Sequence, residues 1–392
     1  MIFLGCLFDR KDEQSILENN KGGLSNAANT FQWNLIDGIN EISEKPIDIV
    51  NVLPVGTYPN SYNRLFLETK DWSYGDSDNI EIGSINLPFL KQFVREKKIK
   101  RLIKKKGDKN IIIYSAYLPF LRAVQRLDKS YNISLIVTDL PEFYDLGKTS
   151  GLRKILRKAN NKLIYKCLKR IDSFVLLTEQ MKYPLKVGDR PYVVVEGIAN
   201  TLQMAVTLPE PGKRIILYAG TLHYQFGIKT LLDAFEMIDD EAYELWICGS
   251  GDAEEEIKKL AEKDKRIKFY GYVTKQQVAQ YQSHATVLVN PRTNEGEYTK
   301  YSFPSKTMEY LAAGKPVIMH KLDGIPDEYD EYLYYINGPS AEDLKNTILV
   351  ACSKTDDELA RFGAKASKWV LKEKSPAGQA KKIIRMIENE RI

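Results

Sequence analysis

The sequence YSFPSKTMEYLAAGKPVI, residues 301–318, decides the fold class of this chain. An apolar run at 286–290 predicts a strand before it, and the polar loop 292–300 separates the two. Pro304 suits a first helical turn, and Gly314 with Pro316 predicts where a helix over 304–313 ends. The apolar run 316–319 then predicts a second strand. This order predicts a βαβ unit of a parallel sheet.

The same alternation runs along the whole chain. In the first half, predicted strands cover 1–8, 47–53, 110–115, 134–138, 173–177 and 192–195, with helices at 24–39, 88–106 and 152–170. In the second half, strands cover 214–218, 244–248, 267–270, 286–290 and 316–319, with helices at 229–237, 253–264, 276–283 and 304–313. We therefore expect two doubly wound α/β domains, with ligands at the carboxyl ends of the strands.

The length of 392 residues suits two such domains. Residues 200–213 carry prolines and polar residues without a clear period, which favours a linker. We expect an N-terminal domain over 1–203, a C-terminal domain over 204–375 and a last helix in 376–392 that returns to the first domain.

Composition excludes several classes of protein. No apolar stretch is long enough to span a bilayer, and residues 1–8 suit a buried strand better than a signal peptide. The four cysteines have no paired spacing and suit reduced core residues of a cytoplasmic protein. The three histidines have no ligand spacing, so we expect no metal site.

The net charge of +5 is unevenly distributed along the sequence. Residues 91–109 have a charge balance of +8 and residues 148–170 one of +9, which leaves −12 for the rest of the chain. Both basic stretches lie in the first half, so we expect a polarised surface.

The helix at 304–313 carries one acid among apolar residues. We expect this helix to be largely buried, so that Glu309 needs a partner. A pair of vicinal ribose hydroxyls would serve, because one carboxylate can accept hydrogen bonds from both. The start of the helix, with Ser302, Ser305 and Lys306, suits a diphosphate. A structural Glu bonded to backbone amides, with Lys306 solvated, is the alternative.

Residues 301–318 resemble the sugar-nucleotide signature of family 4 of the retaining glycosyltransferases, in which a Glu on this helix binds the donor ribose. The sequences ILYAGTLHYQFGIKTLLDAF (216–235), LWICGSGDAEEEI (245–257), FYGYVT (269–274) and VLVNPR (287–292) match that domain in order and spacing. The short sequences TDLPE (138–142), NPR (290–292) and YSFPSK (301–306) are most similar to those of the bacterial polysaccharide-assembly branch of this family. The resemblance implies the GT-B fold, two Rossmann-like domains with a deep cleft between them.

The resemblance and the residues at the expected strand ends together give the candidate donor contacts. Besides Glu309, they are Tyr301, Ser302, Phe303, Pro304, Ser305, Lys306, Arg292, Gly220, Thr221, His223, Gly249, Gly251, Tyr272 and Val273, with Gly22 and Gly23 from the first domain. The Gly pair follows the first strand, where the family has a glycine-rich loop. By itself such a pair is usually only a turn.

Three positions depart from the family pattern. Tyr301 stands where the family has the first of two Glu residues, and Thr221 and Phe226 stand where it has an Arg and a Lys that clamp the diphosphate. Arg292 and Lys306 are our candidates to replace these cations, because Arg grips phosphate in a forked geometry. Arg292 could instead be an ordinary loop residue.

Asp139 is the candidate catalytic residue of the first domain. It follows the predicted strand 134–138, and an acid at the carboxyl end of a parallel strand faces the ligand crevice. The chain has no His before His223, so Asp139 is our candidate to orient or deprotonate an acceptor hydroxyl. Its alternative role is to cap the following turn, and Glu142 is a weaker candidate.

The basic helix 152–170 has apolar residues at steps of three and four. It fits a core-facing helix with a solvated basic side, or a helix attracted to an anionic membrane through Arg153, Lys154, Arg157 and Lys158. No hydrophobic anchor is visible, which favours peripheral contact. We expect no nucleic-acid partner, since no RNA-binding motif is present.

Together these features predict a retaining glycosyltransferase. The donor would be a nucleotide sugar, UDP-linked on family grounds, and the acceptor a glycan or lipid-linked sugar. No cofactor or metal is expected, because GT-B enzymes generally use helix ends and cations instead. The alternatives are an epimerase-like enzyme and a catalytically dead partner subunit, which the three departures favour.

Overall fold

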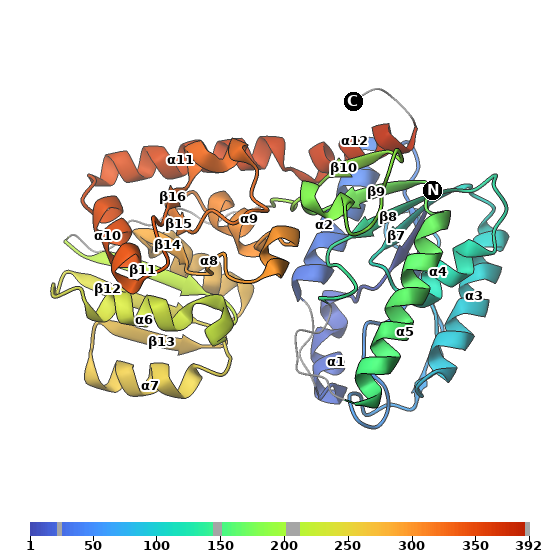
Figure 1. Cartoon of the computed structure of the whole chain (residues 1–392), viewed down its shortest axis with the longest axis horizontal. Coiled ribbons are helices and arrows are strands. Elements are labelled where there is room, and N and C mark those ends of the chain that lie inside the picture. The colour runs from blue at the N-terminus through green and yellow to red at the C-terminus, as the bar shows by residue number, and fades with distance from the viewer. Residues whose placement is uncertain (22–25, 144–150, 201–211, 389–392) are drawn as a thin grey trace. The chain divides into compact units, whose positions relative to one another are not determined.

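The computed structural model describes residues 1–21, 26–143, 151–200 and 212–388 of the chain, leaving aside the side chains of Arg10, Leu152 and Arg153. The chain forms two compact units (Figure 1). Unit 1 consists of Met1–Ile198 and Pro376–Ile392, and unit 2 of Ala199–Ser375. Each unit is a parallel sheet covered by helices, so the predicted class of two Rossmann-like α/β domains is confirmed.

The sheet of unit 1 has the strand order β10-β9-β8-β7-β1-β2-β5-β4. All neighbours pair in parallel except β4 with β5. Its strands are β1 (Ile2–Gly5), β2 (Asp48–Asn51), β4 (Lys70–Trp72), β5 (Asn79–Glu81), β7 (Asn110–Tyr114), β8 (Asn132–Val137), β9 (Ser173–Leu176) and β10 (Tyr192–Val194). The strands β3 (Phe66–Leu67) and β6 (Ser84–Ile85) form a small antiparallel ladder. The sequence pattern does not predict β3, β4, β5 or β6, because these two- and three-residue strands do not form apolar runs like those of β10 and β15.

The helices of unit 1 cover both faces of its sheet. They are α1 (Glu13–Asn19), α2 (Asn26–Ile42), α3 (Leu90–Lys106), α4 (Leu118–Gln125), α5 (Leu152–Cys167) and α12 (Pro376–Ile387). On one face, Ile36 of α2 and Ile383 of α12 join a core with Phe3 and Ile112 of the sheet. On the other, α4 packs between α3 and α5 (Figure 1). A Cβ added to Gly38 would lie 2.1 Å from the carbonyl oxygen of Pro376, so α2 and α12 touch through their backbones.

The sheet of unit 2 has the order β13-β12-β11-β14-β15-β16 and is parallel throughout. Its strands are β11 (Arg214–Ala219), β12 (Tyr243–Cys248), β13 (Ile267–Gly271), β14 (Val287–Asn290), β15 (Val317–Met319) and β16 (Tyr334–Tyr335). The chain starts at β11, proceeds outward to β13 and then returns to the other side of β11 with β14. The strand order therefore reverses between β11 and β14, which is where doubly wound sheets bind their ligands.

Helices also cover both faces of this second sheet. They are α6 (Ile228–Glu236), α7 (Glu254–Lys263), α8 (Lys275–His284), α9 (Ser305–Ala312), α10 (Ala341–Cys352) and α11 (Asp356–Glu373). One core contains Phe235 of α6, Ile257 of α7 and Ile348 of α10, and the other contains Leu311 of α9 and Val370 of α11. Short 3₁₀ helices occur at Arg10–Asp12, Leu168–Arg170, Glu179–Lys182, Tyr224–Phe226 (η4), Glu297–Tyr301 (η5) and Asp327–Tyr332.

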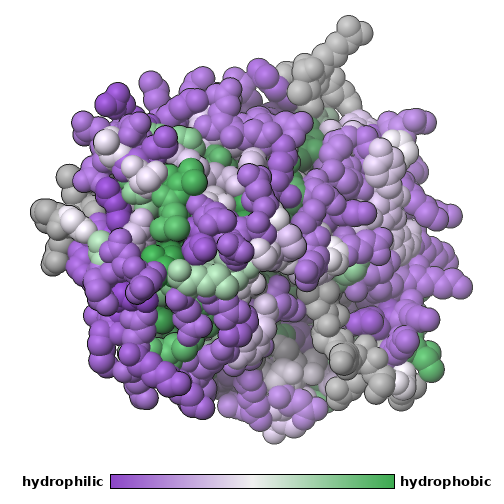
Figure 2. Space-filling model, turned by 60° about the vertical axis from the view of Figure 1, so that its left-hand side comes forward, coloured by the Kyte–Doolittle hydropathy of each residue, from purple (hydrophilic) through white to green (hydrophobic). Residues whose placement is uncertain are grey.

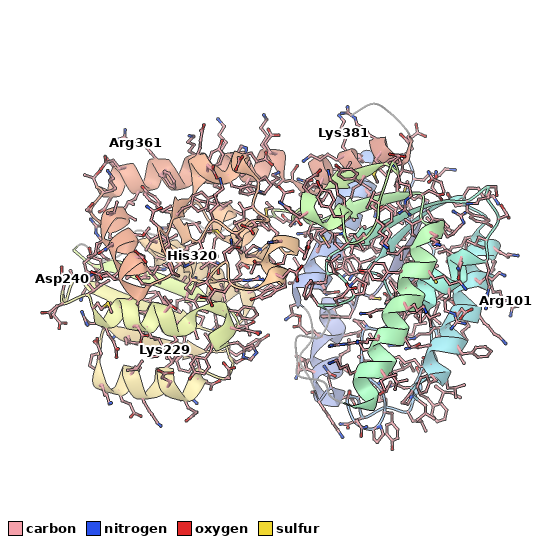
Figure 3. The ribbon with its side chains drawn as sticks, in the orientation of Figure 1. Arg101, Lys229, Asp240, His320, Arg361 and Lys381 are labelled. Carbon is pink, nitrogen blue, oxygen red and sulfur yellow. The ribbon has the colours of Figure 1, made fainter. Side chains whose placement is uncertain are left out.

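The water-facing surface is mostly polar. Arg101 of α3 and Arg361 of α11 are exposed and point outward (Figure 3). The face shown in Figure 2 is largely hydrophilic, with a strip and a few smaller spots of apolar surface. Among the described residues, the exposed large apolar side chains of unit 2 are Tyr224, Met237, Tyr272 and Val350, whereas unit 1 has many more.

The hydroxyl of Tyr310 connects α9 to the end of β11. Tyr310 is completely buried, and its hydroxyl accepts a hydrogen bond of 2.9 Å from the Ala219 amide and donates one of 3.2 Å to the Ala219 carbonyl. Ala219 is the last residue of β11. The contact therefore fixes the start of the helix that follows β14 against the end of β11.

Replacing Tyr310 by Phe should lower the free energy of unfolding of unit 2 by about 1–3 kcal/mol, because the buried Ala219 amide loses its acceptor. Denaturant unfolding of the full chain measures this difference. Tyr332→Phe is the matched control: Tyr332 stacks on Trp369, and its hydroxyl makes no hydrogen bond to any described residue. The control should change stability by less than about 0.5 kcal/mol. Equal losses in the two variants would contradict the role given to the hydroxyl.

Candidate functional site

Three glycines bring two loops of unit 2 into contact at the carboxyl edge of its sheet. A Cβ on Gly249 would lie 1.7 Å from the carbonyl oxygen of Gly220, and a Cβ on Gly251 would lie 2.4 Å from that of Leu222. Side chains are therefore excluded at both positions, and the loops after β11 and β12 meet backbone to backbone. Such a surface lets a ligand approach the main chain closely.

Lys306, in the first turn of α9, lies against this glycine surface. A Cβ on Gly220 would meet Lys306 Cε at 2.3 Å and Nζ at 2.9 Å. The ammonium makes no hydrogen bond or ion pair with any described residue, and burial lowers its pKa while Glu309 acts in the opposite direction. A desolvated cation without a partner is costly, so the site would be stabilised by an anion.

Arg292, the second residue after β14, lies beside Phe226, at the far end of the loop 220–226 that begins with Gly220. Its Nη2 donates a 2.8 Å hydrogen bond to Ser302 Oγ. The guanidinium carbon is 5.0 Å from the ring centre of Tyr298 and 5.7 Å from that of Phe226. The two rings and the Ser302 hydroxyl restrict this side chain to one geometry. Arg292 is thus a positioned residue of the edge and not a free loop side chain.

These positions explain how the edge can lack cations at Thr221 and Phe226. Lys306 lies beside Gly220, next to Thr221, and Arg292 lies beside the ring of Phe226. The two positive charges thus come from α9 and from the loop after β14, but they reach the two ends of the loop 220–226. Their contact with a diphosphate stays a prediction.

The amino end of α9 is open to a ligand. Pro304 precedes the helix, and no side chain caps its first amide groups. Phe303 and Pro304 are buried, whereas Ser305 is exposed. Uncapped amides at a helix start bind anions well, because they carry part of the helix dipole. Tyr301 ends η5 directly before this turn.

Glu309 differs from its prediction in one respect. It was expected to be buried in the helix, yet its side chain is exposed, because the buried faces of α9 belong to Met308, Tyr310 and Leu311. Gln282 of α8, itself buried, donates a 3.1 Å hydrogen bond to Glu309 Oε1. The carboxylate is therefore oriented and still open to solvent. No sequence signal points to Gln282, which lies 27 positions away.

The remaining predicted donor residues of unit 2 also lie at this edge. Thr221 is exposed, and its carbonyl accepts a 2.7 Å hydrogen bond from the Tyr218 hydroxyl. The Asp252 amide donates a 3.4 Å hydrogen bond to His223 Nδ1. Tyr272 directly follows β13 and is 71% exposed, with Val273 half-buried beside it in sequence. An exposed ring at a sheet edge can stack on a planar base.

In unit 1, Gly22 and Gly23 lie outside the described residues. Asp139 is exposed and lies two residues beyond β8, at the carboxyl edge of the sheet, as its spacing predicts. Glu142 accepts a 2.9 Å hydrogen bond from the Tyr165 hydroxyl of α5. That contact gives Glu142 a structural partner.

The apolar residues of α5 correct the prediction of a core-facing stripe. Ile155, Leu156 and Leu163 are 64%, 48% and 45% exposed, and the buried face instead contains Ile164 and Cys167. Lys154 and Lys158 are exposed and Arg157 is half-buried; the side chain of Arg153 is not described. The first turns of α5 thus expose apolar and basic side chains together. The sequence pattern did not predict this exposure of apolar side chains, and whether they act as an anchor stays untested.

Metal ligands do not cluster in the part of the chain that the structure describes. His320, at the end of β15 inside unit 2, is buried, and burial lowers its pKa (Figure 3). Over the same residues, none of the helices combines the length and apolar character that crossing a bilayer requires.

Comparison with known proteins agrees with this geometry. Residues 213–354 match the model of the family described as Glycosyl transferases group 1. A search of the curated proteins found no match.

Solved structures resemble the chain over its full length. The apo form of the lipopolysaccharide outer core galactosyltransferase WaaB has 15% identity and a TM-score of 0.66, covering 100% of this chain and 99% of that one. Sucrose-phosphate synthase from Thermosynechococcus elongatus has 16% identity, a TM-score of 0.66 and the same coverage. HepE from Anabaena, solved with UDP, has 12% identity and a TM-score of 0.59, covering 99% of each chain. The chain therefore has the GT-B fold of glycosyltransferases, and its residues 213–354 are similar to the glycosyl transferases group 1 family.

Proposed function

We propose that the chain transfers a sugar from a nucleoside-diphosphate donor to a glycan or lipid-linked acceptor. The observation that carries this proposal is the desolvated, unpartnered Lys306 at the glycine surface, beside the uncapped start of α9. A diphosphate is the anion that fits both features. UDP is the proposed nucleotide, on the family resemblance and on one structural neighbour that was solved with UDP.

The cationic edge would act mainly on the leaving group. Negative charge develops on the diphosphate as its bond to the sugar breaks, and donors already in position stabilise it without reorganisation. Lys306, Arg292 and the first amides of α9 supply that charge and those donors. The proposed reaction therefore needs no metal ion.

Glu309 and Tyr272 would bind the nucleoside. The exposed carboxylate, oriented by Gln282, can accept hydrogen bonds from two ribose hydroxyls. The exposed Tyr272 ring offers a stacking surface for the base. On the acceptor side, Asp139 would orient or deprotonate the attacking hydroxyl, and the resemblance implies that the sugar keeps its anomeric configuration.

A catalytically inactive partner subunit is the alternative. Tyr301 stands in place of the first Glu of the family pattern and supports this alternative. Nucleotide binding without turnover on any acceptor would favour it. Release of free sugar without transfer would instead favour hydrolase or epimerase chemistry.

Binding of uridine and UDP to three variants tests the donor site. Glu309→Gln should lower the affinities for uridine and for UDP by a similar factor, because both ligands carry the ribose. Lys306→Met and Arg292→Gln should each weaken UDP by about tenfold, or about 1.4 kcal/mol, with little effect on uridine. Lys259→Met is the matched control, since Lys259 is an exposed cation of α7. Calorimetry gives the affinities. Parent-like UDP binding in folded Lys306 and Arg292 variants would remove them from the diphosphate site.

Asp139→Asn should lower turnover by about 10²–10⁴-fold, the usual contribution of a general base, and leave UDP affinity unchanged. The change keeps the size of the side chain and removes its charge. Glu142→Gln, three residues further along, is the control and should keep most activity. Full activity in the Asp139 variant would return this residue to a turn-capping role.

We also propose that α5 attaches the protein peripherally to an anionic membrane. Ile155, Leu156 and Leu163 are exposed next to Lys154 and Lys158, and this combination suits a helix lying at the lipid–water interface. Each exposed cation near such a surface contributes about 1 kcal/mol. Lipid-linked acceptors would then be reached from the membrane surface.

Charge reversal at Arg153, Lys154, Arg157 and Lys158 should abolish binding to anionic liposomes at low salt without changing UDP affinity. Replacing Ile155 and Leu156 by Ser should instead reduce the binding that survives high salt, because the apolar contact is not screened. Reversal at Lys259 and Lys263 of α7 is the control. Liposome sedimentation measures all three. A parent protein that ignores anionic liposomes at low salt would refute the attachment.

A further inference from the structure

A second potential site lies entirely within unit 1. A cavity of about 290 Å³ opens at the carboxyl edge of its sheet. Its walls come from Cys6 after β1, residues 52–55 after β2, Tyr117 after β7 and the start of α3. The strand order reverses between β1 and β7, so the cavity occupies the switch point of this sheet.

Two cations of α3 line the cavity. Lys91 and Arg95 are only 6% and 2% exposed, although the sequence suggests two ordinary members of a basic surface stretch. Lys91 Nζ donates to the carbonyl oxygens of Val55 and Gly56, at 2.6 and 3.3 Å. Arg95 donates to the Tyr117 hydroxyl at 3.1 Å and to the Leu53 carbonyl at 3.2 Å. Its Nε–H is buried and has no partner.

No acid faces these cations from the cavity wall. The lining contains neither Asp nor Glu, and burial raises the pKa of the Cys6 thiol to about 12. Glu96, on the same helix, pairs with Arg122 and Arg126 instead. Burial, and then the neighbouring Arg95, lower the pKa of Lys91 to about 7. Glu81 of β5 interacts electrostatically with Arg95 but does not line the cavity. Two buried like charges with no acid in the cavity wall are costly, so an anion in the cavity would be stabilised.

Apart from Thr57 and Gln92, the rest of the wall is mostly apolar and continues to the surface. Leu87 and Phe89 line the cavity and are also exposed, Phe89 by 73%. Phe89 has a φ of 61°, a conformation that non-glycine residues rarely adopt. Leu90 and Phe93 of the next turns are exposed as well. An anion in this cavity could therefore be joined to an apolar chain lying across these residues.

We propose that this cavity binds the phosphate group of the acceptor, through Lys91 and Arg95. That this ligand is the acceptor rests on the function proposed above. Cys6 and Asp139 follow β1 and β8, which are two strands apart, so the phosphate would bind roughly 10 Å from Asp139. One acceptor would thus be bound by its phosphate at one place and react at another. The apolar rim favours a prenyl phosphate over a soluble sugar phosphate as the carrier.

A purely structural role is the alternative for both cations, because their hydrogen bonds also position the loop 53–56 after β2. That role predicts lower stability in the variants and no phosphate binding by the parent. Phosphate binding by the unmodified protein therefore distinguishes a binding role from a purely structural one.

Calorimetric titration with geranyl monophosphate, geraniol and glucose 1-phosphate tests the proposal. The parent should bind geranyl monophosphate saturably and geraniol at least tenfold more weakly. Lys91→Gln and Arg95→Gln should weaken the phosphate ligand at least tenfold, and Arg95→Lys should weaken it less than Arg95→Gln. Lys104→Gln, an exposed lysine of the same helix, is the control and should bind like the parent.

The titrations answer two separate questions: whether the cavity binds phosphate, and which molecule carries that phosphate. Glucose 1-phosphate binding that the same variants weaken supports the phosphate site and identifies a soluble carrier. Binding of neither phosphate by the parent, or parent-like binding in folded Lys91→Gln and Arg95→Gln, overturns the site. UDP titration of every protein reports on unit 2 alone, so a failed donor site is distinguishable from a failed phosphate site.

Discussion

The candidate donor site depends on the pair of hydrogen bonds between the Tyr310 hydroxyl and Ala219. Because Tyr310 is fixed to the end of β11, Lys306, one helical turn earlier, must lie against Gly220. Glu309, the preceding neighbour of Tyr310, must then point to the solvent side of α9. One buried hydroxyl thus holds in place the helix that carries both charged groups.

The two units resemble each other in where they place their desolvated cations. Each places cations from a helix at the point where its strand order reverses: Lys306 in unit 2, and Lys91 with Arg95 in unit 1. In both places burial lowers a lysine pKa, and no acid among the described residues forms an ion pair with the ammonium. This shared arrangement supports the two anion sites proposed above.

Helix 304–313 and its flanking strands could be predicted from the sequence because Pro304, Gly314 and Pro316 mark the ends of the helix, which spans Ser305–Ala312. The placement of Asp139 followed from strand periodicity in the same way. Exposure was harder to predict: Glu309 and the apolar residues of α5 are exposed, and Lys91 is buried. Which face of an amphipathic helix is covered depends on residues that are distant in sequence. Gln282, the hydrogen-bond partner of Glu309, is likewise 27 positions away.

The discontinuity of unit 1 has a consequence for biosynthesis. Ala380, Ile383 and Ile387 of α12 complete the core beneath α2, although they are made only after the whole of unit 2. Unit 2, by contrast, is one continuous segment, Ala199–Ser375. Unit 2 can therefore fold as soon as it has been made, whereas unit 1 must wait, with its core beneath α2 incomplete, until α12 has been made as well.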